Sequence, residues 1–128
     1  MFNNTELAKL LLRLSVGVLI LFHGVHKVIH GVSGVKGMLN SAGLPEFLAY
    51  GVYVGEVVAP IFIILGLYAR LASIVLGINM LMAIFLAYGF SFSLAKYGGL
   101  AMESPLIFFI MSMLIVLLGS GKYSVNNK

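Results

Sequence analysis

The chain has 128 residues, of which 61% are hydrophobic and 9% are charged, and its mean hydropathy is +1.09. A soluble domain of this size buries only part of its surface and carries about a quarter charged residues, so the composition favours a lipid environment. The absence of cysteine excludes disulfides, thiolate-bound iron–sulfur clusters and covalently attached c-type haem. The net charge of +4 is scattered rather than gathered in a basic run, which argues against nucleic acid as a partner.

Four apolar runs follow one another along the chain, at about residues 7–29, 47–68, 70–90 and 100–119. Each is close to the roughly 20 residues with which a helix crosses about 30 Å of hydrocarbon. Backbone polar groups inside a bilayer need internal partners, so these runs predict transmembrane helices. We therefore expect an all-α fold in which one domain, residues 1–128, forms a polytopic membrane protein with a four-helix transmembrane bundle.

The first and last runs need separate comment. Lys9 and Arg13 precede the apolar core of the first run, as basic residues do in a signal peptide, but no small-residue cleavage site follows, so a retained helix is predicted. The last run is too short for a span if it is counted from Pro105, so it is taken to begin near Leu100, with Pro105 within its first turns.

The segment between the first two predicted helices contains "GVKGMLNSAGLP", whose glycines and Pro45 mark turns. Its apolar residues, such as Val35 and Met38, are suited to resting on a membrane surface. We predict a short re-entrant or interfacial segment here, and the alternative is a disordered connector.

The distribution of charge predicts an orientation. One end of the bundle carries Lys9, Arg13, Arg70, Lys122 and Lys128, and the other carries Lys27, Lys36, Lys96, Glu46 and Glu103. By the positive-inside rule, both termini are expected in the cytoplasm. Glycines spaced for close helix packing allow contacts within the bundle or between copies in a homo-oligomer.

Ionisable groups inside a membrane span are costly, so each is a candidate site residue. The polar residues that fall inside the predicted helices are Arg13, His23, Glu56 and Asn79. At a rise of about 1.5 Å per residue, Arg13 lies roughly 9 Å and Glu56 roughly 17 Å from the cytoplasmic end. On the same estimate Asn79 is level with Glu56, and His23 lies above it. We predict that these residues line a central ligand-binding cavity in which Arg13 reaches Glu56, whereas Lys27 lies too far outward.

A second polar layer is expected at the outer mouth of this cavity. Its members are His26, Lys27, His30, Lys96 and Glu103. On a helical wheel the histidines and Lys27 fall within one arc of the first helix. His23 and His30 are about 10 Å apart along the helix axis, which is too far to share one ion easily, so no metal site is predicted.

These side chains suit more than one chemistry. A quinone has two carbonyl oxygens that accept hydrogen bonds from His, Arg or Asn, whereas an oxyanion such as thiosulfate or sulfite would favour Arg13, Lys27 and the histidines. A proton path through Glu56 and His23 is a further alternative. Structural interpretations stand beside these: Arg13–Glu56 as an ion pair that fixes helix register, Asn79 as an interhelical hydrogen bond, and the outer residues as snorkelling side chains.

Several motifs together resemble the DoxX family of small bacterial membrane proteins. They are "LLRLSVGVLILFHGVHKV", "GLP", "GEVVAPIFIILGLYARLAS", "NMLMAI", "GGLAMESPL" and "LLGSGKYSV", and they cover nearly the whole chain. The resemblance implies four helices in the bacterial cytoplasmic (inner) membrane. It also implies a link to sulfur oxidation or oxidative-stress defence, because the family is named for the small subunit of a membrane thiosulfate:quinone oxidoreductase.

Three functional hypotheses remain open from the sequence. The first is a redox-associated membrane subunit or quinone-binding module that holds no covalent cofactor and works with membrane or peripheral redox enzymes. The second is a membrane anchor or scaffold for partner enzymes without chemistry of its own. The third is a carrier for protons or a small molecule. Catalytic activity is not assigned by the residues, since fold carries over between relatives better than reaction does.

Overall fold

The computed structural model describes residues 4–89, 94 and 98–126. Its regular secondary structure is helical, joined by turns and loops, with one isolated bridge between Leu94 and Leu100 among the described residues. The elements in order are α1 (Thr5–His30), α2 (Ser33–Ser41), η1 (Glu46–Tyr50), α3 (Gly51–Tyr53), η2 (Val54–Val58), α4 (Ala59–Leu65), α5 (Ala69–Tyr88) and α6 (Glu103–Leu118). The predicted all-α class is confirmed.

Three helical segments are long and apolar enough to cross a membrane, by length and composition. The first is α1, and the third is Ala69–Ala87 within α5. The second, called the second span below, is the continuous helical run Glu46–Leu65, which consists of η1, α3, η2 and α4. The apolar helix α6 is shorter, with 16 residues. Large apolar side chains such as Phe22 on α1 and Leu117 on α6 are exposed on the outside of the protein. Such a surface is suited to contact with lipid, and the chain is a multi-pass membrane protein.

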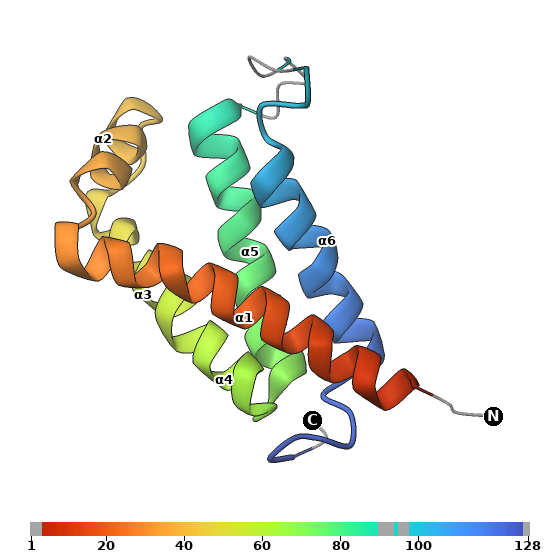
Figure 1. Ribbon diagram of the computed structural model, residues 1–128. Coiled ribbons are helices and arrows are strands. Elements are labelled where there is room, and N and C mark those ends of the chain that lie inside the picture. Colours follow the sequence, from red (N-terminus) through yellow and green to blue (C-terminus); the bar gives the residue numbers. More distant parts are fainter. Residues whose placement is uncertain (1–3, 90–93, 95–97, 127–128) are drawn as a thin grey trace.

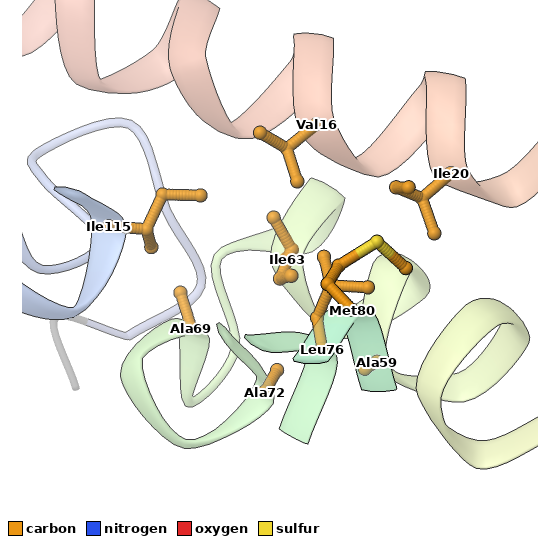
Figure 2. Close-up of a cluster of buried hydrophobic side chains, with 9 residues drawn as sticks. All are labelled: Val16, Ile20, Ala59, Ile63, Ala69, Ala72, Leu76, Met80 and Ile115. Atoms are coloured by element: carbon orange, nitrogen blue, oxygen red, sulfur yellow. The ribbon is translucent and has the colours of Figure 1, made fainter. Parts of the chain in front are cut away.

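The helices pack around one apolar core. α5 and α6 lie side by side, and α1 crosses obliquely over α4 and α6 (Figure 1). Val16 and Ile20 of α1 point toward Ile63 of α4 and Leu76 of α5, with Ile115 of α6 at the edge (Figure 2). Helices α1, α4, α5 and α6 therefore meet in one cluster, and this cluster fixes how α1 lies on the others.

The turn between the second and third spans differs slightly from the prediction. The predicted runs 47–68 and 70–90 leave only residue 69 between them, but Ala69 is already the first residue of α5. The helix ends instead at Gly66, whose φ of 70° is a left-handed conformation that glycine adopts at little cost. Tyr68 also has a positive φ of 48°, and its N–H donates to the Asn126 side chain at 2.9 Å.

The segment between α1 and the second span contains α2, which packs against the spans. Val32, Leu39 and Ala49 form a small buried cluster, and Leu86 of α5 packs against it. Lys36 of α2 donates to the Tyr50 hydroxyl at 2.7 Å, and its ammonium lies 4.7 Å from the Tyr50 ring centroid. α2 is therefore held to η1 by an apolar contact and a polar one.

The Lys36–Tyr50 contact makes the attachment of α2 sensitive to alkaline pH. The hydrogen bond to Tyr50 raises the pKa of Lys36 above its ordinary value of 10.5. A raised folded-state pKa stabilises the docked state below the ordinary pKa, and the contribution is lost as pH rises through the raised pKa. The chain has no tryptophan, so Phe47→Trp in η1 supplies a unique emission signal. We expect that signal to shift above pH 10.5.

The matched variant for this experiment is Tyr50→Phe in the Phe47→Trp background, which keeps the ring but removes the hydroxyl that accepts from Lys36. Its emission should already be shifted at neutral pH and should change less at alkaline pH. An identical titration in both proteins would contradict this account of how α2 is attached.

Candidate functional site

Glu56 lies in a π-helical turn, which is a wider turn than the α-helix. Pro60, four residues further along, has no N–H to donate to the Glu56 carbonyl, so the usual helical hydrogen bond is missing at this position. The helix is π-helical over η2, Val54–Val58. Such turns are rare in proteins, and many of those that occur lie at functional sites. The local sequence thus places Glu56, the one acidic residue between the ends of the run Glu46–Leu65, in an irregular turn.

Gly24 of α1 packs directly against this turn. A Cβ atom at Gly24 would overlap the carbonyl oxygen of Glu56, so only glycine allows the two backbones to come this close. Gly17 lies two helical turns before Gly24 on α1. A Cβ at Gly17 would lie 3.1 Å from the Pro60 carbonyl oxygen and still closer to the Ile64 side chain. Gly17 and Gly24 therefore set the register between α1 and the second span.

Three polar side chains meet beside this contact. The Lys27 Nζ donates to Glu56 Oε1 at 2.5 Å, and the Asn79 Nδ2 donates to Glu56 Oε2 at 2.8 Å. Glu56 is 4% exposed, and the Lys27 side chain is 27% exposed. Both carboxylate oxygens have a donor, which is what a buried carboxylate requires. An ammonium has three N–H donors, and the ion pair uses one of them.

Small residues make room for the triad formed by Lys27, Glu56 and Asn79. A Cβ at Gly55 would lie 2.7 Å from the Asn79 side chain, so glycine at this position lets Asn79 reach Glu56. Tyr53, one turn earlier, donates from its hydroxyl to the Lys27 carbonyl oxygen at 3.4 Å. Residues of α1, the second span and α5 are thereby joined at one point.

The triad lies on the wall of a cavity of about 340 Å³. Apart from these three residues, the lining is apolar and comes from α2, the second span and α5. These apolar and small residues are Val35, Met38, Leu39, Leu48, Gly51, Val52, Gly55, Val75, Ile78, Met82, Ala83, Leu86 and Ala87. An apolar cavity of roughly 300–1,000 Å³ with a few convergent polar groups is the usual form of a small-molecule site.

The predicted pairing of Arg13 with Glu56 is wrong, and so is the prediction that Lys27 lies too far outward. The depth estimate assumed upright helices, whereas α1 crosses the others obliquely (Figure 1). Glu56 packs against Gly24 of α1. Lys27 is three residues after Gly24 and therefore lies on the same face of α1, within reach of Glu56. Arg13 is eleven residues before Gly24, roughly 16 Å along the helix at about 1.5 Å per residue.

Arg13 instead lies under the segment that follows α6. It is 1% exposed, and its Nη2 donates to the carbonyl oxygen of Tyr123. Nε and Nη1 have no hydrogen-bond partner among the described residues. A Cβ at Gly66 would overlap Nη1, so the turn after α4 leaves space for the guanidinium. The predicted burial of Arg13 in the bundle is found, but its partner is a backbone carbonyl at the end of the chain.

The residues after α6 form a tail that closes this end of the bundle. The backbone N–H of Lys122 donates to Glu6 Oε2 at 2.6 Å, which ties the tail to the start of α1. The N–H groups of Val125 and Asn126 donate to the carbonyls of Leu65 and Gly66 at 3.0 and 3.2 Å. The tail thus joins the first turn of α1 to the α4–α5 turn.

Replacing Arg13 with methionine is expected to loosen this tail. Methionine keeps much of the buried volume but cannot donate to the Tyr123 carbonyl. A hydrogen bond to a charged group contributes about 1.5–3 kcal/mol, so amide exchange at Lys122, Val125 and Asn126 should accelerate at least about tenfold. Hydrogen-exchange mass spectrometry measures this, with Leu11→Met on the exposed face of α1 as the control. Unchanged exchange in Arg13→Met would contradict the anchoring role of Arg13.

The other predicted site residues lie apart from the triad. His23 is exposed, and its ring meets the edge of Phe108 with the ring centroids 6.4 Å apart. His26 and His30 are exposed and face one another, with ring centroids 4.3 Å apart. Glu103 is exposed at the start of α6, and Lys96 lies outside the described residues. Of the predicted outer layer, Lys27 alone lines the cavity among the described residues.

The sequence predicted no metal site, and the structure can be searched for one only in its described part. Within residues 4–89, 94 and 98–126, no group of three or more His, Asp or Glu side chains is arranged to hold a metal ion. The candidate site is therefore built from Lys27, Glu56 and Asn79 and their apolar surroundings. Sequence reasoning found all three residues but placed Lys27 in a different layer.

The helices and the cavity together define a class: a small multi-pass helical membrane protein with a ligand-sized apolar cavity between its spans. Comparison with known proteins makes this more specific. The family model DoxX matches residues 8–89, and the chain belongs to the DoxX family. The matched residues include the whole triad.

Two curated relatives are similar to this chain. A Bacillus subtilis (strain 168) protein named "Putative oxidoreductase CatD" is 30% identical over 84 residues, 66% of this chain. That match spans 62% of the relative, less than two thirds of its length. A Haemophilus influenzae protein (strain ATCC 51907 / DSM 11121 / KW20 / Rd) named "Uncharacterized protein" is 30% identical over 122 residues, 91% of this chain and 87% of the relative. No solved structure matches the chain.

Proposed function

We propose that this protein is a redox-associated membrane module that binds the headgroup of a lipid-soluble quinone in the cavity beside Lys27, Glu56 and Asn79. The observation that carries the proposal is the cavity itself: about 340 Å³, apolar except for these three residues. A flat ring with polar oxygens at its edge matches such a lining better than a small anion does. An oxyanion would lose its hydration in exchange for one cation that Glu56 already neutralises.

The donors that would hold the headgroup are Lys27 and Asn79. The Lys27 ammonium has N–H groups beyond the one it gives to Glu56, and one of these would donate to a ring carbonyl oxygen. The Glu56–Lys27 pair can also hold a proton next to that oxygen. The electrons for reduction would come from a partner redox enzyme, because the chain has no cysteine for thiol chemistry. The relative named as an oxidoreductase supports a redox association.

The proposal includes a topology. In it, α6 is the fourth membrane crossing, α2 lies at the outer interface, and both ends of the chain face the cytoplasm of a bacterial inner membrane. Support comes from the tail, since the contact between Lys122 and Glu6 brings the beginning and end of the described chain to one side. That contact supports an even number of crossings. The basic residues Lys9, Arg70 and Lys122 all lie close to this tail, as the positive-inside rule requires of a cytoplasmic side.

Binding is tested with the purified protein in nanodiscs and with menadione, a tail-free naphthoquinone. At a hundred times its Kd, a ligand stabilises the folded state by about 2.7 kcal/mol, so the melting temperature should rise by several degrees. Asn79→Ala should lose most of this rise, because Asn79 lines the cavity. His23→Ala is the matched control, since His23 is exposed and makes no contact with the triad among the described residues.

Two results would contradict the proposal. One is a melting temperature of the wild type that menadione does not raise. The other is an equal rise in Asn79→Ala and in the wild type. Thiosulfate at the same concentrations provides the test of the oxyanion alternative, and stabilisation by thiosulfate alone would favour an anion site.

A further inference from the structure

A second cavity lies next to the first, along the same pair of helices. Its volume is about 210 Å³, and it is lined by Val54, Val58, Ala59, Phe62, Tyr68, Leu71, Ala72 and Val75. Val75 also lines the first cavity. The two cavities are therefore neighbours, with this residue of α5 in the wall of both.

The helical spacing shows that both cavities belong to one seam. On α5 and the residue before it, the lining residues of the second cavity are Tyr68, Leu71, Ala72 and Val75, and those of the first continue with Ile78, Asn79, Met82 and Leu86. These steps of three and four residues follow one face of a helix. On the opposite wall, Gly51 and Gly55 line the first cavity, and Val58 and Phe62 line the second. The seam thus runs between the second span and α5.

The chemistry changes along this seam. The triad marks the first cavity, whereas the second is lined by aliphatic and aromatic side chains with no charged residue, and its one hydroxyl is that of Tyr68. Val54, Val58 and Leu71 are about half exposed on the outside of the helices, where lipid would be. A polar section followed by an apolar section open to lipid is complementary to a ring that carries a hydrocarbon tail.

We infer that the seam lined by Val58, Phe62 and Leu71 is the subsite for the isoprenoid tail of the quinone. This inference rests on the proposed function, because the ring must occupy the first cavity for its tail to enter the second. Seven residues separate Tyr68 from Val75, which is about 10 Å of helix. The seam therefore holds the part of the tail nearest the ring, and the remainder of the tail lies in the bilayer.

Affinity is a poor measure of this subsite. A tail that moves from lipid into an apolar seam gains no hydrophobic free energy, since lipid is as apolar as the side chains. The position of the tail is the informative quantity. The probe is a naphthoquinone whose alkyl tail carries a photoactivatable diazirine close to the ring, used with the full-length protein in nanodiscs.

After illumination, peptide mass spectrometry locates the labelled residues. We expect labels on residues 54–62 and 68–75, and excess menadione should remove them because it displaces the ring. Val58→Phe fills the seam and should lower the labelling at least fivefold. Leu117→Phe, an exposed residue of α6 outside both cavities, is the control and should leave the labelling unchanged.

The outcomes separate the two proposals. If menadione does not stabilise the wild type, the proposed function fails, and the tail subsite fails with it. If menadione stabilises the protein but the labels lie on the lipid-facing sides of α1 and α6, the subsite alone is overturned. A fatty acid with the same diazirine tests for membrane lipid. Labelling of the seam by that fatty acid, unaffected by menadione, would overturn the subsite as well. Stabilisation of Val58→Phe by menadione would show that this variant is folded. If the variant does not fold, the positions of the labels on the wild type alone decide whether the tail subsite is correct.

Discussion

Gly24→Ala is expected to destabilise the protein strongly for so small a change. The added methyl group would overlap the carbonyl oxygen of Glu56, and neither the α1 backbone nor the π-helical turn can rotate away as a side chain would. Overpacking in a tight interior costs about 1–3 kcal/mol, and a backbone partner places this substitution at the upper end of that range. The free energy of unfolding in detergent, measured by denaturant titration, should fall accordingly.

The same substitution should also impair the site. Separating α1 from the second span moves Lys27 away from Glu56, so stabilisation by menadione should be lost along with stability. Gly34→Ala in α2 is the matched control, because nothing lies within 4 Å of a Cβ there. Alanine in that open helical position should be neutral or slightly stabilising. A wild-type unfolding free energy in Gly24→Ala would show that the two helices are not in this register.

The second large effect concerns the ion pair. Glu56→Leu leaves the Lys27 ammonium beside an apolar wall without its carboxylate, and breaking a buried pair in this way costs about 3–5 kcal/mol. Lys27 is 27% exposed and is three residues from the end of α1. It can therefore turn partly outward, and the loss should be near the lower end of that range.

The double variant Lys27→Met with Glu56→Leu separates structure from binding. Replacing both charges with apolar residues of similar size is often neutral for stability, so the unfolding free energy should return close to the wild-type value. Stabilisation by menadione should stay absent, because the donor that would hold the ring is gone. Two measurements suffice: denaturant titration of both variants, and the melting temperature with and without menadione. A double variant that still responds to menadione would remove Lys27 and Glu56 from the proposed site.

The sequence predicted the spans well and the lateral contacts only in part. Hydropathy and helix length located α1, the second span and α5 because both depend on local composition. The cost of polar groups in lipid identified Glu56 and Asn79, which do form a hydrogen bond. Their common depth was visible from counting residues along two adjacent helices joined by a short turn.

Arg13 and Lys27 could not be assigned correctly by counting. Their partners depend on the tilt of α1, which is set by the core around Val16 and Ile63 and by the Gly24 contact. The glycines seven residues apart on α1 were the available signal, since they mark where another backbone comes closest. The partner of Arg13 is a main-chain carbonyl of the tail, and a pattern of side chains in the sequence cannot predict a main-chain acceptor.

The π-helical turn at Glu56 has one more consequence. A turn of this kind is an α-helix with one extra residue accommodated in it, so the residues before and after it are out of step by about 100° compared with a regular helix. Gly51, Val52 and Gly55 thereby line the cavity while Ile63 packs in the core. A regular helix of the same length could satisfy one of these directions but not both. The extra residue lets a single span serve as a wall of the site and as a support of the core.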